Sequence, residues 1–314
     1  ISEKFENAVK IRIQNSDRPI GFLLSGGFDS SIVASVAKEI LGPDIKIKTF
    51  SIGTKDDSPD VIAARTMADY IQSDHTEVEF NFEEGYNNLK NVIKSLETYD
   101  TTTIRASVPM WLLCKHIKEH SNCRVLLSGE GSDELFGGYK YFKNTDSAEA
   151  FSRENIRRLR TLHQFDVLRA DRCISAHGLE ARVPFLDRDF IDCGMTIDQN
   201  LKMSELEKYI LRVSFKDKLP NEILWRSKDA FSDAVGYGWV DFMRNKGEEL
   251  ISVAEFESIK ALAMGHNVPT TKEEALYRKI FWNVFGMTDD HLIQDIWRPR
   301  WSNVTDPSAR KLGI

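Results

Sequence analysis

The chain has 314 residues, of which 41% are hydrophobic and 29% are charged, and its formal net charge is −6. This composition is ordinary for a soluble globular protein and excludes an intrinsically disordered chain. It also excludes a membrane partner, because no apolar run reaches the length of about 18 residues that a bilayer requires, and it disfavours a nucleic-acid partner, which usually meets a basic stripe.

The first half of the chain alternates between strand and helix signals. Ile20–Leu24 is a short apolar run that leads to a glycine pair, and Ser31–Leu41 then has helical spacing. Ile45–Ile52 alternates as a strand does, and Ser58-Pro59 offers a cap and a first-turn proline to a helix through Tyr70. The pattern therefore predicts two strand-to-helix units in succession.

The same alternation continues to residue 134. A third strand is expected at Glu77–Phe80, followed by helices over Glu83–Thr98 and Ala106–His120. Arg124–Leu127 then forms a fourth apolar strand that leads into the glycine-rich loop Ser128–Glu134. Strands alternating with helices predict a parallel sheet, whose ligands bind beyond the carboxyl ends of the strands. We expect both glycine-rich loops to lie at that edge.

Helical periodicity dominates from about residue 147 onward, with little strand signal. We therefore predict an α/β fold in which a twisted parallel sheet carries helices on both faces and the C-terminal half is rich in helix. The whole chain, 1–314, is expected to form one domain. Its parts are an α/β part, 1–146, and a mostly helical part, 147–314.

The first loop, Ser25–Ser31, joins a strand to the start of a helix, where unpaired N–H groups favour an anion. Two glycines allow phosphate oxygens to approach the backbone closely, and Asp29 suits Mg²⁺ bound together with phosphate. The loop lacks the lysine of a P-loop and does not fit G-x-G-x-x-G. It resembles the S-G-G-x-D-S loop of the N-type ATP pyrophosphatases. The alternative is a tight turn without a ligand.

The second loop, Ser128–Glu134, places three carboxylates and two glycines within seven residues after an apolar strand. If Asp133 shares one metal ion with Asp29, Glu130 remains available for acid–base work. Taken alone, the loop could equally be an acidic turn exposed to solvent.

Further stretches extend the pattern, in order, along nearly the whole chain. The second loop and Phe136-Gly137-Gly138-Tyr139 together resemble the second signature of the asparagine synthetases. The other matching stretches are Glu97-Thr98-Tyr99-Asp100, Thr102-Thr103-Ile104-Arg105-Ala106-Ser107, Gly178 to Asp187, Trp225-Arg226-Ser227-Lys228, Phe231-Ser232-Asp233 and Thr305 to Arg310. The chain therefore resembles the synthetase domain of that family. The resemblance implies an adenine nucleotide alpha hydrolase-like fold.

The resemblance implies a role for each matching position. Adenosine would contact the backbone near Leu23, Leu24, Ile52, Ser128 and Gly129. Pyrophosphate and Mg²⁺ would be held by Ser25, Gly26, Gly27, Asp29, Ser30 and Asp133, with Asp29 and Asp133 as the metal ligands. Aspartate and its acyl-adenylate would lie against Thr102, Thr103, Arg105 and Asp166. The catalytic residues would be Glu130, Lys228 and Arg105, with Lys228 neutralising charge on the α-phosphate.

The implied reaction is ATP-dependent amidation of L-aspartate through β-aspartyl-AMP, with AMP and Mg-pyrophosphate as products. A ring-closing relative of the β-lactam synthetase type is an alternative, although the match over Thr102–Ser107 argues against it. A non-catalytic ATP-binding homologue is a second alternative. Such a protein would be expected to have lost Asp29, Glu130, Asp133 or Lys228, and all four are present.

The nitrogen source and the cellular setting follow from the cysteines and the first residue. Position 1 is Ile and the first methionine is Met67, so we expect a fragment of a longer product. Glutamine-dependent members begin with a cysteine nucleophile, whereas the first cysteine here is Cys114. We therefore expect ammonia as the nucleophile of this fragment, a glutaminase domain N-terminal to it in the full-length protein, and a reducing cytoplasm as its location. A homodimer is left open.

Overall fold

The computed structural model describes residues 1–54, 58–227, 238–302 and 306. Five strands form one parallel sheet in the order β3-β2-β1-β4-β5. Their bounds are β1 Ile20–Leu23, β2 Lys48–Gly53, β3 Asp74–Glu79, β4 Val125–Leu127 and β5 Glu180–Arg182. The predicted parallel sheet is confirmed, although β2 begins three residues later than the alternating pattern indicated and β3 begins three residues earlier.

The position of β1 at the centre of the sheet brings the two glycine-rich loops together. The register pairs Leu23 of β1 with Phe50 of β2, and Phe22 with Leu127 of β4. Because β1 and β4 are parallel neighbours, the loops that leave them at residues 24 and 128 emerge side by side. The sequence-based expectation that both loops lie at the carboxyl edge is confirmed.

Helix α1 was not predicted, and the other helices of the first half differ from the prediction mainly in where they begin. Their bounds are α1 Ser2–Gln14, α2 Phe28–Leu41, α3 Pro59–Ile71, α4 Phe82–Asn87, α5 Leu89–Leu96 and α6 Thr101–His120. The expected helix 83–98 is divided between α4 and α5. Helix α6 starts five residues earlier than expected because the Asp100 side chain accepts a hydrogen bond from Thr103 N and caps it. Thr102, Thr103 and Arg105 therefore lie on a helix.

The second half is rich in helix, as predicted. Its α-helices are α7 Ser132–Phe136, α8 Ala148–Thr161, α9 Asp166–Ser175, α10 Arg188–Thr196, α11 Gln199–Lys202, α12 Tyr209–Ser214, α13 Asn221–Leu224, α15 Trp239–Leu250, α16 Val253–Leu262 and α17 Lys272–Phe285. Short 3-10 turns are η1 Lys140–Asn144, η2 Leu162–Gln164, η3 Pro184–Leu186 and η4 Met287–Leu292. Strand β5 was not predicted, because Glu-Ala-Arg over three residues has neither an apolar run nor a readable alternation.

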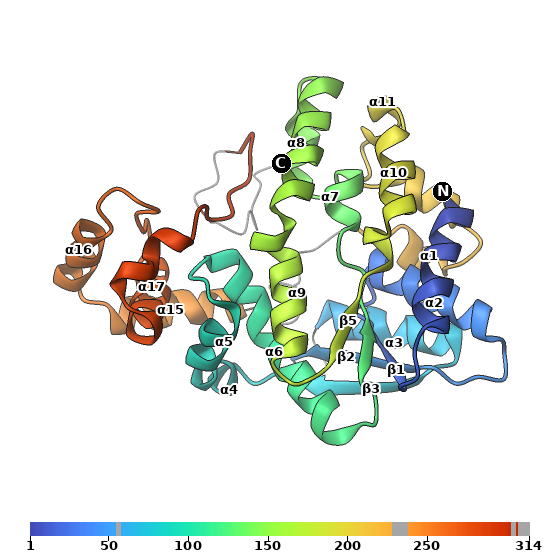
Figure 1. Cartoon of the computed structure of the whole chain (residues 1–314), viewed down its shortest axis with the longest axis horizontal. Helices are drawn as coiled ribbons and strands as arrows, with labels where there is room; N and C mark the ends of the chain where they lie inside the picture. The colour runs from blue at the N-terminus through green and yellow to red at the C-terminus, as the bar shows by residue number, and fades with distance from the viewer. Residues whose placement is uncertain (55–57, 228–237, 303–305, 307–314) are drawn as a thin grey trace.

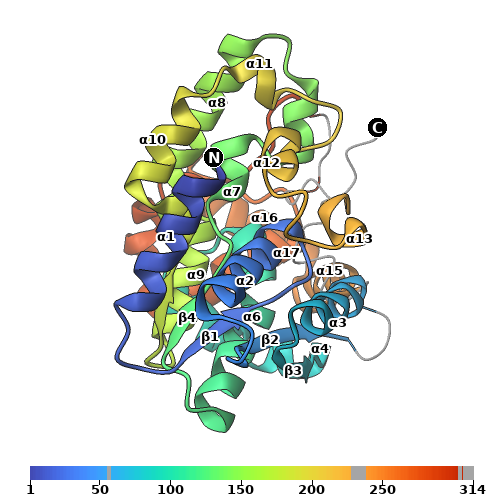
Figure 2. The ribbon, with the colours of Figure 1, turned by 90° about the vertical axis from the view of Figure 1, so that its right-hand side faces the viewer.

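Helices cover both faces of the sheet, and each face has its own hydrophobic core. Phe22 and Val125 pack in one core with residues of α1, α2 and α3. Phe50 and Leu126 pack in the other with residues of α5, α6, α9 and α17. Figures 1 and 2 show α1–α3 and α6 with α9 on opposite sides of the strands, and α15–α17 beyond α4 and α5. Both cores support the loops at the carboxyl edge.

In the part of the chain that the structure describes, no helix combines the length and the apolar character that a membrane crossing demands.

Candidate active site

A cavity of about 270 Å³ opens at the carboxyl edge of the sheet. Most of the predicted site residues line this one cavity. They are Leu23, Leu24, Ser25, Gly27, Asp29, Ser30, Ile52, Thr102, Thr103, Ser128, Gly129, Glu130, Asp133 and Asp166. The two loops, the first turn of α6 and the start of α9 therefore face a common space.

The first loop is built as an anion site. Helix α2 begins at Phe28, and no side chain among the described residues caps it, so its first N–H groups remain available at the cavity wall. The hydroxyls of Ser25 and Ser30 lie 3.0 Å apart, and Ser25 N donates to Ser30 Oγ at 3.2 Å. Gly26 does not line the cavity, but its φ of +71° turns the loop, and a Cβ there would lie 2.3 Å from the α3 backbone at Ala63.

The second loop packs directly against the first. A Cβ on Gly129 would lie 2.7 Å from the carbonyl carbon of Asp29 and 2.8 Å from Ser30 N. Glycine is therefore required for the two backbones to meet. This contact brings the Asp29 and Asp133 carboxylates, which come from different loops, to neighbouring positions in the cavity.

Lys208 joins these two carboxylates. Its Nζ donates to Asp29 Oδ1 and Oδ2 at 2.8 and 2.6 Å and to Asp133 Oδ1 at 2.8 Å, while its side chain is 2% exposed. Lys208 also has a φ of 60°, which is uncommon for a residue with a side chain. The ammonium group therefore occupies a point at which both carboxylates converge on one cation, an arrangement that fits the predicted metal ligands.

An acidic cluster lies beside this point. The Tyr139 hydroxyl donates to Asp166 Oδ2 at 2.9 Å and also contacts Glu134 Oε1. Burial of Glu134, together with the charges of Asp166 and Asp133, raises the pKa of its carboxyl above the ordinary range. The buried tyrosine–carboxyl cluster consequently supplies groups that can hold or exchange a proton.

Glu130 is held by a buried guanidinium. Arg169 Nη2 donates to Glu130 Oε2 at 2.8 Å and to Asp166 Oδ1 at 3.1 Å, so one arginine orients two of the predicted site carboxylates. Burial alone would lower the pKa of Arg169, but the charges of Glu130 and Asp166 outweigh it and raise that pKa. Glu130 is thus positioned as a carboxylate acceptor facing the cavity.

Arg105 is not among the residues that line the cavity, unlike most of the other predicted site residues. Its side chain is 1% exposed and pairs with Glu273 and Asp306 on the side of α6 away from the cavity lining. A substrate carboxylate could reach Arg105 only by breaking these pairs. Lys228 and the Phe231–Asp233 stretch lie outside the described residues, although Ser227 does line the cavity.

Sequence reasoning missed several cavity residues. Tyr139 belonged to a quoted motif but was given no role. Arg169 could have been found from its spacing of three residues from Asp166 on one helix, which suits an ion pair. Lys208 lies in a polar stretch without glycine, proline or strand, and Trp297 lies far along the chain, so neither had a local signal.

Comparisons with known proteins place this chain in a family. The family model described as asparagine synthase matches residues 1–151 and 143–305. A probable asparagine synthetase [glutamine-hydrolyzing] of Dictyostelium discoideum is 44% identical over 99% of this chain, and the asparagine synthetase [glutamine-hydrolyzing] of Bos taurus is 47% identical over 98%. The chain spans 59% and 56% of the lengths of these relatives. A solved NMN synthetase of Francisella tularensis, 12% identical, covers 95% of this chain and 98% of its own with a TM-score of 0.39. The chain belongs to the asparagine synthase family.

Proposed function

We propose that this chain is the synthetase part of an asparagine synthetase and converts L-aspartate, ammonia and ATP into L-asparagine, AMP and pyrophosphate. One observation carries the proposal: Asp29 and Asp133 converge on a single cation in the same cavity that Glu130 and Thr102 line. An anion-binding loop, a cation position and an acid–base carboxylate are what adenylation followed by amidation requires.

ATP would lie along the carboxyl edge with its phosphates at the first loop. The N–H groups at the start of α2 and the Ser25 and Ser30 hydroxyls supply donors for pyrophosphate oxygens. The ends of β1, β2 and β4 supply backbone groups for adenosine near Leu24, Ile52 and Gly129. Gly129 keeps the adenosine and phosphate sides in contact, because any larger residue would separate the loops.

The carboxylates of Asp29 and Asp133 suit Mg²⁺, which commonly takes one or two carboxylates together with phosphate oxygens. When bound, the ion would neutralise negative charge on the phosphates. Among the described residues no group of three or more His, Cys, Asp or Glu could hold a metal ion. Asp29 and Asp133 would therefore hold Mg²⁺ together with oxygens of the bound phosphates. Lys208 competes with a cation for the same oxygens.

In the first step an oxygen of the aspartate β-carboxylate attacks the α-phosphorus of ATP. The bond from that phosphorus to the oxygen bridging the α- and β-phosphates breaks, and pyrophosphate leaves. Residues that line the amino-acid side, including Thr102, Thr103 and Asp166, would hold aspartate in line for this attack. By resemblance, Lys228 neutralises charge that develops on the α-phosphate.

In the second step ammonia attacks the acyl carbon of β-aspartyl-AMP and AMP leaves. The attacking nitrogen must lose a proton to give the neutral amide. Glu130 is the acceptor that we assign, because Arg169 holds its carboxylate at the cavity wall. In the full-length protein we propose that an N-terminal glutaminase domain supplies this ammonia, since the relatives are longer and are named glutamine-hydrolyzing.

The test is asparagine formation by the purified chain with ammonium chloride, MgATP and aspartate, measured together with ATP–pyrophosphate exchange. Asp133→Asn should abolish both, because it removes one of the two converging carboxylates. Glu77 of β3 pairs with Arg65 of α3, and Glu77→Gln, which removes this carboxylate, should leave both activities intact. Absence of exchange with any amino acid would favour the non-catalytic homologue, and exchange without asparagine release would favour a ring-closing relative.

A further inference from the structure

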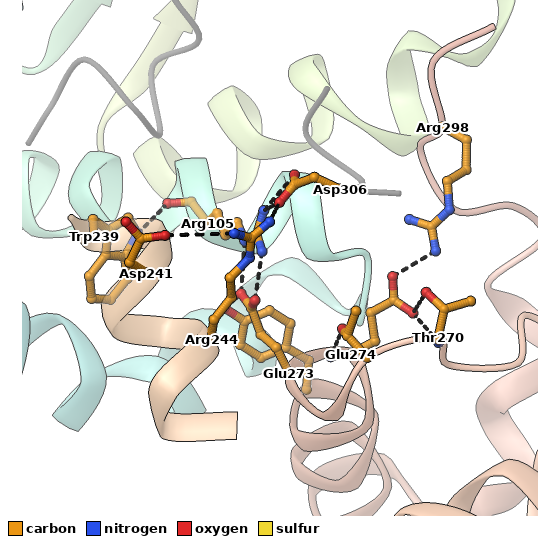
Figure 3. Close-up of polar contacts among 11 residues, drawn as sticks. Arg105, Trp239, Asp241, Arg244, Thr270, Glu273, Glu274, Arg298 and Asp306 are labelled. Carbon is orange, nitrogen blue, oxygen red and sulfur yellow. Dashed lines mark hydrogen bonds and ion pairs between the residues drawn. The ribbon is translucent and has the colours of Figure 1, made fainter. Parts of the chain in front are cut away.

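A buried cluster of ion pairs joins three distant segments behind the cavity. Arg105 of α6 binds Glu273 of α17 through Nε and Nη2, at 2.8 and 2.6 Å. Its Nη1 donates to Asp306 Oδ1 at 3.0 Å, and Arg244 of α15 contacts the other Asp306 oxygen. Figure 3 shows Arg105 between Glu273 and Asp306, with Arg244 alongside. The cluster therefore joins Asp306 to α6 and α15, and α6 to α17.

Each arginine of this cluster pairs with two carboxylates. Arg105 and Arg244 face Glu273 and Asp306, and Arg244 also pairs with Asp241 at 3.6 Å, so carboxylates outnumber the two guanidinium groups among these five side chains. Burial alone would lower the pKa of Arg105, but the hydrogen bond and charge of Glu273 and the charge of Asp306 raise it above its ordinary value. Removing one carboxylate would leave a buried guanidinium partly uncompensated, which is costly. The ion pairs of Asp306 are thus buried interactions and not incidental surface contacts.

The residues before Asp306 include Trp297, which lines the cavity. We call Trp297–Ser302 together with Asp306 the strap. Trp297 N donates to Asp100 Oδ1 at 2.6 Å, and the Arg298 guanidinium pairs with Glu274 of α17 at 2.6 Å. At the other side Asn144 Nδ2 donates to the Trp301 carbonyl at 2.9 Å. The strap therefore bridges α6 and α17 to the 139–161 region.

Asp100 couples the strap to the substrate wall. Its Oδ1 accepts from Trp297 N and its Oδ2 accepts from Thr103 N, so one buried carboxylate orders both the strap and the first turn of α6. Trp297 itself lines the cavity and packs edge-on against Tyr139, at 5.8 Å between ring centroids. Trp297 is thus linked to Thr103 through the Asp100 carboxylate and contacts Tyr139 directly.

We propose that Arg105 and Asp306 are positioning residues, which fasten the strap so that Trp297 and Thr103 shape the amino-acid side of the cavity. The inference rests on the proposed function and deepens it, because it gives Trp297–Ser302 and Asp306 a part in shaping the aspartate side of the site. The nucleotide side is built on the ends of β1, β2 and β4 and has no part in these contacts. Loss of the Arg105–Asp306 ion pair therefore weakens the binding of aspartate more than the binding of ATP.

The experiment compares Asp306→Asn with wild type and with Glu77→Gln, the remote control for loss of a carboxylate from an arginine pair. Asp306→Asn should raise KM for aspartate about tenfold, well within what misplacement by an ångström produces, and change KM for ATP less than about twofold. A role in global stability alone would lower the active fraction and kcat while leaving both KM values unchanged. That result, or equal shifts in both KM values, overturns the inference.

Hydrogen exchange supplies a readout that does not depend on catalysis. The amides of Trp297 and Thr103, which donate to Asp100, should exchange faster in Asp306→Asn than in wild type, and α2 should be unchanged. Unchanged exchange at both amides in Asp306→Asn overturns the inference. Faster exchange in Asp306→Asn, found together with a wild-type chain that makes no asparagine, supports the role of Asp306 in holding the strap and rejects the proposed function. If Asp306→Asn does not fold, Arg244→Gln removes a half-exposed partner of the same carboxylate and should give the same pattern more weakly.

Discussion

Replacing Lys208 with methionine tests whether the two loop carboxylates form a cation site. Methionine keeps much of the length of lysine but leaves Asp29 and Asp133 facing each other without the ammonium that now joins them. Each ion pair has a Coulomb energy of about 6 kcal/mol at an effective dielectric constant of 20, most of it offset by desolvation. Breaking a buried pair costs about 3 to 5 kcal/mol. The carboxylates of Asp29 and Asp133 are 19% and 15% exposed. We therefore expect Lys208→Met to lower the unfolding free energy by about 3 kcal/mol, the lower end of that range.

The loss of unfolding free energy in Lys208→Met should depend on magnesium. In Lys208→Met, Mg²⁺ no longer competes with an ammonium for the carboxylates, so the ion should stabilise the variant more than wild type. At ten times its dissociation constant a bound ion adds about 1.4 kcal/mol. The assay is urea unfolding followed by far-UV circular dichroism, once with EDTA and once with magnesium chloride, at constant ionic strength.

A second buried lysine provides the control. Lys202 is 3% exposed and donates to the Leu135 carbonyl, so Lys202→Met also removes a buried ammonium but leaves no pair of facing carboxylates. Its stability loss should be the same with EDTA and with magnesium. An equal response of both variants to magnesium, or a loss below about 1 kcal/mol for Lys208→Met, would refute the cation-site reasoning.

Three further changes test other parts of the cavity. Glu130→Gln should preserve ATP–pyrophosphate exchange and lower asparagine formation about 100-fold, because a proton acceptor is needed after the adenylate forms; an equal fall in both assays would contradict this. Gly129→Ala should raise KM for ATP at least tenfold, because its Cβ would lie 2.7 Å from the Asp29 backbone; steady-state kinetics with varied ATP would detect this. The folded-state pKa of Glu134 is raised above 4.5, so its carboxyl contributes stability at low pH that is lost as pH rises. Glu134→Gln should therefore gain stability over wild type from pH 5 to 8, by at most about 1.4 kcal/mol per unit in urea unfolding, and a constant difference would argue against a buried neutral acid.

The site loops were predictable because their signals are local. Two apolar runs that each end in a glycine-rich loop specify parallel strands, and parallel strands bring their carboxyl ends to one edge. Asp29 and Asp133 could thus be placed together, although 104 positions separate them by number. Strand β5 had no such signal, since its three residues are ordered by pairing with β4 and not by their own pattern.

Lys208 could not be found in the same way, because its position depends on packing. Lys208 immediately precedes α12, and Leu211 of that helix packs in the core shared with α2. This packing places the Lys208 side chain next to loops that are far away in sequence. A lysine in a polar stretch is ordinarily a solvated residue. Its burial follows from two carboxylates that reach it from other segments, and a single sequence does not reveal such a coincidence.

Arg105 illustrates how a helix boundary decides a functional assignment. Thr102, Ala106, Met110 and Leu113 all line the cavity, and their spacing places them on one face of α6. Arg105 directly precedes Ala106, so its side chain is rotated by about 100° from that face. The predicted helix began at Ala106, which left Arg105 in a loop where any direction was allowed. Recognising Asp100 as the cap of a helix from Thr101 would have turned Arg105 away from the substrate and toward a structural partner. Its partners, Glu273 and Asp306, lie 168 and 201 residues away, and only the folded chain could identify them.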